Sequence, residues 1–117
     1  MMQFSEEKPI WRQIYEFIAM RILSGEWCES GRIMSVREMA ANVGVNPNTV
    51  MRSYERLEVD GIIYNRRGVG FFVSEGARDH IKQLERKKFM DEELPKLRER
   101  LSLIGLSIEV RVQIGDE

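Results

Sequence analysis

The most informative part of the chain lies between Ser35 and Phe72, which read SVREMAANVGVNPNTVMRSYERLEVDGIIYNRRGVGFF. Its first residues form a capping-box pattern, because the Ser35 hydroxyl can accept the backbone N–H of Glu38, whose carboxylate can reach back to the serine N–H. Apolar residues then recur at the three- and four-residue spacing of a buried helical face. Gly44 suits the left-handed exit of a helix. These features predict a helix that begins after Ser35 and ends at Gly44.

A second helix is predicted after a short turn. Asn46 is a favourable N-cap residue, and Pro47 fits the first helical position, where no backbone N–H is needed. One side of this helix is apolar and is expected to face inward: Val50, Tyr54 and Leu57. The other side carries amide, hydroxyl and guanidinium groups: Asn48, Arg52 and Arg56, with Thr49 at its edge. Such groups can bind base edges in a major groove, although an ordinary solvated amphipathic helix shows the same pattern.

A short hairpin is predicted beyond Gly61. The triplet at 62–64 is β-prone, a glycine-containing turn follows at 65–70, and residues 71–73 return as the second strand. The turn presents two cations and two glycines, and the glycines allow a close backbone approach to a neighbouring molecule: Arg66, Arg67, Gly68 and Gly70. Together the two helices and the hairpin predict a mainly α fold with a small β-hairpin, the winged helix-turn-helix.

These motifs resemble the GntR family of bacterial transcription regulators. The matching segments are SVREMA at 35–40, GVNPNTV at 44–50, YERLE at 54–58, GII at 61–63 and RRGVGFFV at 66–73. They occur in the order and at the spacing of the family, and the resemblance covers roughly residues 9–73. The short segment beyond them is similar to that of the YtrA-like subgroup, whose members carry only a small helical dimerisation segment.

The resemblance implies a sequence-specific DNA-binding regulator, expected to be a homodimeric repressor on a pseudo-palindromic operator. The positions expected to contact DNA, from the family motif and the exposed helix face, are Arg37, Asn48, Thr49, Arg52, Arg56, Arg66, Arg67, Gly68 and Gly70. Pro47 and Met51 stand where the family often has arginine, so the operator of a distant relative does not transfer. For Arg37, pairing with a neighbouring glutamate is the alternative.

Residues 1–75 are expected to form the DNA-binding domain, and residues 76–117 a short helical dimerisation tail. In the first part, an amphipathic helix over residues 9–24 is expected to support the two helices of the motif. In the tail, a helix is expected over residues 77–90, with Asp91 as the cap of the next helix. Pro95 is expected to force a break or kink near Met90.

A narrow apolar seam repeats at three, four and three residues in the tail: Leu94, Leu97, Leu101 and Ile104. Such a seam requires a partner surface, either on its own domain or on a second subunit, and the resemblance favours the second subunit. Apolar residues then alternate between Leu106 and Ile114, which suggests a strand, whereas relatives suggest a helix. The conformation of residues 106–117 stays open.

Composition limits the other functions. The 117 residues suit one compact unit with a short appendage, and the net charge of −1 gives no global basic signature. The single cysteine, Cys28, excludes an internal disulfide and a cysteine-rich zinc site. No apolar run approaches the ~20 residues that span a bilayer, and no signal peptide is visible, so a cytoplasmic protein is expected.

Catalysis is not expected, and no cofactor or metal is predicted. The single histidine, His80, lies in the polar tail, and Gly68–Gly70 lacks the helix and lysine of a phosphate-binding loop. The expected partners are double-stranded DNA and a second copy of the chain. Two alternatives remain: a protein-interaction module that uses the leucine seam, and a regulator that binds a small effector between the tail and the DNA-binding domain.

Overall fold

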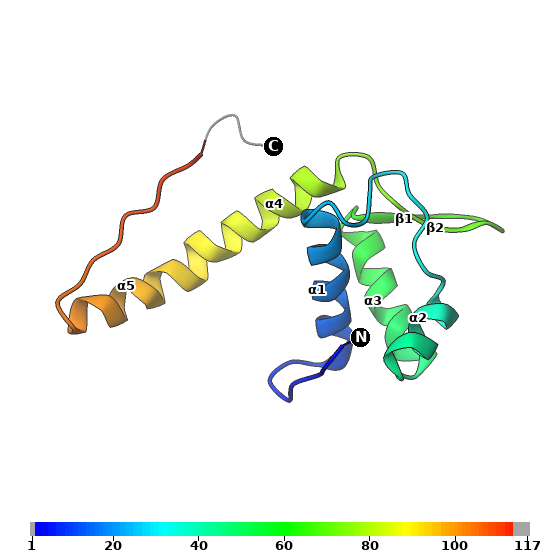
Figure 1. Ribbon diagram of the computed structural model, residues 1–117, viewed down its shortest axis with the longest axis horizontal. Coiled ribbons are helices and arrows are strands. Elements are labelled where there is room, and N and C mark those ends of the chain that lie inside the picture. Colours follow the sequence, from blue (N-terminus) through cyan, green and yellow to red (C-terminus); the bar gives the residue numbers. More distant parts are fainter. Residues whose placement is uncertain (1, 114–117) are drawn as a thin grey trace. The chain divides into compact units, whose positions relative to one another are not determined.

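The computed structural model describes residues 2–113, and the chain divides into two compact units, Met1–Lys82 and Gln83–Glu117. The first unit contains α1 (Ile10–Leu23), α2 (Val36–Val43) and α3 (Pro47–Val59), followed by β1 (Ile63–Arg66) and β2 (Gly70–Val73). The helices α1 and α3 lie side by side (Figure 1). This arrangement of helices and hairpin is the winged helix-turn-helix, as the sequence predicts.

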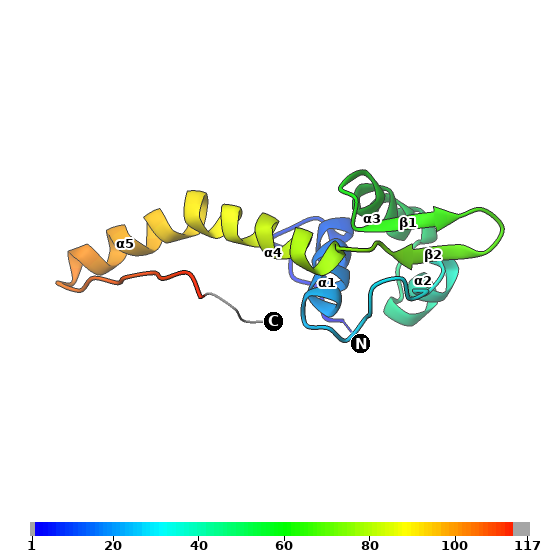
Figure 2. The same cartoon turned by 90° about the horizontal axis from the view of Figure 1, so that it is seen from above.

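The two strands form an antiparallel hairpin, the wing. Ile63 lies opposite Val73, and Arg66 lies opposite Gly70. Arg32, in the loop before α2, adds an isolated bridge to Phe72 on the other side of β2. Seen from above, the tip of the hairpin projects beyond the helices (Figure 2). The wing therefore has a paired base and a tip that lies open to solvent.

The caps of α2 and α3 confirm the sequence signals. The Ser35 hydroxyl accepts the Glu38 N–H at 3.1 Å, and the Glu38 carboxylate accepts the Ser35 N–H at 2.8 Å. The hydrogen bond from the Ser35 backbone lowers the pKa of the Glu38 carboxyl, because it stabilises the charged form. Gly44 takes the left-handed conformation at φ 70°, and the Asn46 side chain accepts the Asn48 N–H at 2.7 Å. Local hydrogen bonds and the left-handed glycine thus fix where α2 begins and ends and where α3 begins.

The core of the first unit lies between α1 and α3. The residues predicted to face inward from α3, namely Val50, Tyr54 and Leu57, are completely buried. They belong to one apolar cluster with Ile14 and Ile18 of α1. This burial leaves the opposite face of α3 to the solvent.

The second unit begins within the helix α4 (Ala77–Lys88), continues through one π-helical turn, η1 (Phe89–Glu93), and ends in α5 (Leu94–Leu103). The expectation that Asp91 caps a new helix is wrong, because Asp91 lies inside the π-helical turn and pairs with Lys87 at 2.8 Å. Pro95 lacks an N–H, and its ring would clash with the Asp91 carbonyl in a regular α-helix. A widened turn relieves that clash without ending the helix.

The members of the leucine seam differ in burial. Leu94 is buried and Leu101 is half-buried, whereas Leu97 and Ile104 are 37% and 70% exposed. Residues 106–113 form neither helix nor strand, and Ile114 lies outside the described residues. Among residues 2–113, no helix has the length and apolar character needed to cross a bilayer.

Candidate nucleic-acid interface

The exposed face of α3 carries the polar side chains singled out in the sequence. Asn48, Arg52 and Arg56 are exposed, and Thr49 is half-buried at the edge of this face. They lie opposite the buried residues of the same helix, because the cap at Asn46 and the core fix how α3 is rotated about its axis. Amide and guanidinium groups on one face of a helix can form bidentate hydrogen bonds to base edges.

The wing presents a second set of the predicted DNA-contacting residues at the surface. Arg66 and Arg67 are exposed at the turn, which is closed by the Val69 N–H donating to the Arg66 carbonyl oxygen at 2.8 Å. The Arg66 guanidinium lies 5.2 Å from the centre of the Phe72 ring. Tyr64 stacks against the same ring at 5.7 Å. An aromatic platform therefore supports one of the two cations of the wing.

A third cation at the wing, Arg32, was missed by the sequence reasoning. Its backbone pairs with Phe72, and the neighbouring Ile33 N–H donates to the Phe71 carbonyl oxygen at 2.9 Å. Its guanidinium lies over Gly70, where an added Cβ would lie 2.9 Å from the Arg32 Nε. No local pattern reports this contact, because the two residues are far apart in the sequence. The only sign of this contact in the sequence was the glycine at position 70, which did not reveal that Arg32 is its neighbour.

Arg37 is exposed in the first turn of α2. In the described part of the chain, no ion pair involves Arg37, so the alternative of a glutamate partner is not seen in this structure. In helix-turn-helix proteins, the helix before the recognition helix crosses the DNA backbone. An unpaired guanidinium at this position can reach a phosphate group.

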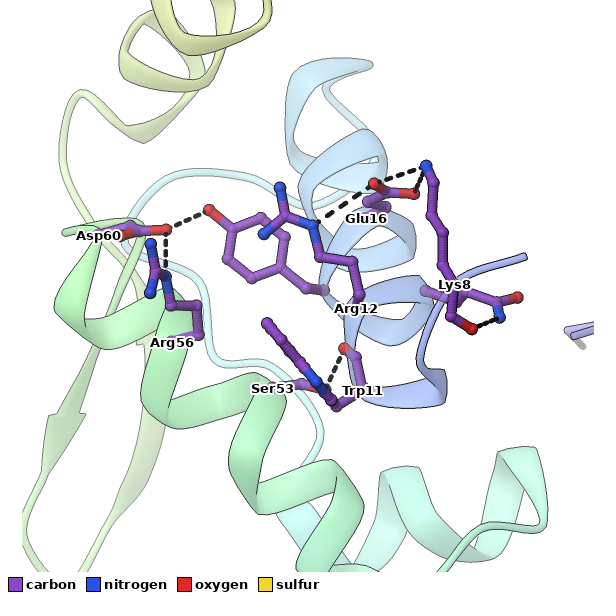
Figure 3. Close-up of polar contacts among 9 residues, drawn as sticks. Lys8, Trp11, Arg12, Glu16, Ser53, Arg56 and Asp60 are labelled. Carbon is purple, nitrogen blue, oxygen red and sulfur yellow. Dashed lines mark hydrogen bonds and ion pairs between the residues drawn. The ribbon is translucent and has the colours of Figure 1, made fainter. Parts of the chain in front are cut away.

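The face between α1 and α3 holds a network of polar and aromatic side chains (Figure 3). The Tyr15 hydroxyl donates to Asp60 Oδ2 at 2.6 Å, and the same oxygen lies 3.4 Å from Arg56 Nε. Burial raises the pKa of Tyr15, and the bond to Asp60 raises it further, so the hydroxyl stays protonated as a donor. Arg56, one of the predicted DNA contacts, is therefore held in an ion pair on the exposed face of α3.

Arg52 has a different neighbour. Its Cζ lies 4.9 Å from the centre of the Trp11 ring on α1. The Trp11 carbonyl oxygen accepts the Ser53 hydroxyl at 2.6 Å, and Ser53 is completely buried (Figure 3). Trp11 and Ser53 were not predicted as site residues, because their roles depend on the packing of two helices.

Among the described residues, no group of histidine, cysteine, aspartate and glutamate side chains could hold a metal ion. The ring of His80 lies with Nε2 2.8 Å from the Asp60 carbonyl oxygen, so this histidine connects the start of α4 to the end of α3. The contact of the His80 ring with the Asp60 backbone joins two helices and does not form part of a metal site in the described part of the chain.

Known proteins are similar to this chain in both sequence and fold. The model of the family described as "Bacterial regulatory proteins, gntR family" matches residues 11–73, more than half of the chain. The HTH-type transcriptional regulator YhcF of Bacillus subtilis is 44% identical over 75 residues, which cover 64% of this chain and 62% of YhcF. The HTH-type transcriptional repressor YtrA of Bacillus subtilis is 40% identical over 70 residues, 60% of this chain and 54% of YtrA. The chain thus matches less than two thirds of either relative.

Solved structures have a similar fold. A GntR family regulator from Bacteroides thetaiotaomicron is 46% identical with a TM-score of 0.71, and the match covers 85% of this chain and 86% of that one. The DNA-binding domain of AraR, solved in complex with the operator ORX1, is 27% identical with a TM-score of 0.58 over 63% of this chain and 93% of that one. This chain belongs to the GntR family of bacterial regulatory proteins, and it resembles the YtrA-like subgroup of that family.

Proposed function

We propose that this chain is a sequence-specific DNA-binding repressor that acts as a homodimer on a pseudo-palindromic operator in the cytoplasm. The observation that carries the proposal is the exposed face of α3 next to a wing that carries Arg66 and Arg67. The helix would enter the major groove, and the wing would contact adjacent phosphates or the minor groove. The relative named YtrA is a repressor, which supports the proposed repressor role. The AraR domain was solved on an operator, which supports the proposed binding to operator DNA.

The second unit supports the homodimer. The seam residues Leu97 and Ile104 are exposed, and so are Leu103 and Leu106, at 82% and 57%. Exposed apolar side chains in this density usually mark an interaction surface. A second copy would cover them and would place two copies of α3 in a two-fold arrangement. Two-fold symmetry predicts operator half-sites about 10 base pairs apart.

The first experiment measures binding of the purified protein to the DNA upstream of its own gene by mobility shift, with scrambled duplex as competitor. Analytical ultracentrifugation of the same complex gives the number of subunits. We expect saturable binding that survives the competitor, with two subunits per site. Equal binding to the upstream DNA and the scrambled duplex, with no preferred fragment in a genomic library, would reject sequence-specific recognition. A complex with one subunit per site would reject the homodimer.

A protein-interaction module that uses the leucine seam is the second candidate, favoured by the same exposed residues and by the net charge of −1. Salt dependence separates the two functions. Binding to DNA releases counterions, so its affinity falls steeply as ionic strength rises. An apolar protein interface lacks this steep dependence.

The double variant Arg66→Ala/Arg67→Ala is expected to weaken binding to operator and scrambled DNA by the same factor. The slope of log affinity against log salt should become shallower by about one for each phosphate contact removed. The matched control is Arg98→Ala/Arg100→Ala on α5, which removes the same charge from exposed positions outside the first unit. Because α5 carries the proposed dimer seam, ultracentrifugation checks that this control variant is still a dimer. A loss confined to the operator would instead show that the wing reads bases.

Gly70→Ala is expected to weaken DNA binding more than Gly68→Ala. Both glycines have positive φ, 140° and 78°, so alanine should strain either site by about 1–3 kcal/mol. An added Cβ meets no atom within 4 Å at Gly68, whereas at Gly70 it would displace the guanidinium of Arg32. Urea unfolding measures the strain, and anisotropy of a labelled duplex measures binding. Equal losses of affinity would show that displacing the Arg32 guanidinium does not weaken DNA binding.

A further inference from the structure

We propose that Trp11 is a positioning residue, whose indole ring holds the Arg52 guanidinium in place for operator recognition. The inference rests on the proposed DNA-binding function, since it concerns how one side chain of that surface is prepared. The two residues are far apart in the sequence: Trp11 lies at the start of α1, and Arg52 lies on the exposed face of α3.

The contact has the geometry of a cation–π interaction. The Arg52 Cζ lies 4.9 Å from the centre of the Trp11 ring, within the range of about 6 Å in which such pairs attract. Arg52 is exposed and Trp11 is half-buried, so the protein covers part of Trp11 while Arg52 stays accessible. Both residues line an open hollow of about 270 Å³, together with Glu55, Arg56 and Val59.

The backbone of Trp11 is itself held against α3. The residue next to Arg52, Ser53, donates its hydroxyl to the Trp11 carbonyl oxygen at 2.6 Å, and Ser53 is completely buried. This bond joins the start of α1 to the middle of α3 (Figure 3). This hydrogen bond therefore fixes the Trp11 backbone, from which the indole projects, relative to the part of α3 that carries Arg52.

In the part of the chain that the structure describes, Arg52 differs from the neighbouring Arg12 and Arg56 in its lack of a carboxylate partner. The Arg12 Cζ also lies near aromatic rings, 4.8 Å from the centre of Tyr15 and 6.0 Å from that of Trp11, but Arg12 pairs with Glu16 at 3.6 Å. Arg56 pairs with Asp60 at 3.4 Å. Within the described residues, no carboxylate forms an ion pair with Arg52, although Glu55 lines the same hollow. A carboxylate would neutralise the guanidinium and compete with DNA. An indole restricts the side chain and leaves its charge and its N–H donors available.

The expected benefit is a smaller entropy loss on binding. A free arginine must be ordered when it binds a base or a phosphate, and ordering one such side chain costs about two- to tenfold in affinity. A guanidinium already held near the recognition surface loses less freedom. Removing the ring should therefore lower operator affinity by up to that factor, and only when Arg52 is present.

The experiment is a double-mutant cycle on the full chain. Trp11→Leu removes the ring, Trp11→Tyr keeps an aromatic ring, and each is combined with Arg52→Ala. Affinity for labelled operator and scrambled duplex is measured by anisotropy. We expect Trp11→Leu to lower operator affinity about two- to tenfold, Trp11→Tyr to restore most of it, and Trp11→Leu to have no further effect in the Arg52→Ala protein.

Losses that multiply in the double variant would overturn the proposal, because they would show that Trp11 acts independently of Arg52. A Trp11→Leu protein with unchanged operator affinity would also overturn it. If wild-type protein does not distinguish operator from scrambled duplex, the proposed function fails instead. In that case the contact itself is tested in the free protein, as follows.

In a Trp27→Phe protein, Trp11 is the sole tryptophan, since the chain has two. Trp27 packs against Phe17 outside the proposed interface, so this change should leave binding intact. We expect Arg52→Ala to change the emission of Trp11, and the control Arg98→Ala on α5 to leave it unchanged. Equal spectra for Arg52→Ala and its parent would refute the contact, even if Trp11→Leu failed to fold.

Discussion

Replacing Tyr54 with alanine is expected to lower the free energy of unfolding by about 3–5 kcal/mol, the range for removing a large aromatic ring from a core. The Tyr54 side chain is completely buried in α3. Its ring meets the edge of Phe71 in the wing at 5.0 Å, and its hydroxyl donates to the Met34 carbonyl oxygen at 2.7 Å. The variant would leave a cavity and an unsatisfied carbonyl oxygen, so two costs add.

Urea unfolding measures this loss, with Tyr64→Ala as the matched control. Tyr64 is 38% exposed on the wing and stacks on Phe72, so its removal should cost far less. Tyr54→Phe isolates the hydroxyl and should cost about 1 kcal/mol. Similar losses for the alanine variants of Tyr54 and Tyr64 would mean that Tyr54 does not connect α3 to the wing as described.

The elements of the first unit were predictable because their signals are local. The capping box at Ser35 and Glu38 and the glycine at position 44 involve residues within one or two helical turns of each other. The cap at Asn46 with Pro47 is equally local. A helical period then determines which side of α3 is buried. Caps and spacing together therefore identified the helices and the exposed face.

The partners of the side chains on that face were not predictable in the same way. Arg52 and Arg56 share one face, yet one lies on an indole ring and the other pairs with Asp60. Arg32 meets Gly70 through the pairing of a loop with β2. Such contacts depend on how helices and strands pack, and a helical wheel carries no information about them.

The tail shows a different limit. Its apolar period predicted a helix with a seam, and α5 carries that seam, but the period does not say what covers each residue. Leu94 is buried within the chain, whereas Ile104 is 70% exposed. A break or kink was expected near Met90, and the chain accommodates Pro95 with a π-helical turn at Phe89–Glu93. The sequence predicted that Pro95 would disturb the helix, but only the structure shows that a π-helical turn accommodates it.

Arg52→Ala is expected to weaken operator binding by about 1–3 kcal/mol if the guanidinium forms hydrogen bonds to a base edge. This corresponds to a factor of about 5 to 150 in affinity. Scrambled duplex should be affected much less, because a base contact is lost only on the correct sequence. Anisotropy of labelled duplexes at fixed salt measures both affinities, and Arg98→Ala provides the control for loss of one exposed charge.

Arg52→Lys separates base recognition from charge. Lysine keeps the positive charge but lacks the planar fork that binds two acceptors of guanine at once. A base-reading Arg52 therefore predicts that Arg52→Lys loses operator affinity almost as strongly as Arg52→Ala. If Arg52 contacts only phosphate, lysine should restore binding, and Arg52→Ala should lose equally on both duplexes. Sequence specificity would then rest on other side chains of the exposed α3 face, of which Asn48 has the best chemistry for an adenine edge.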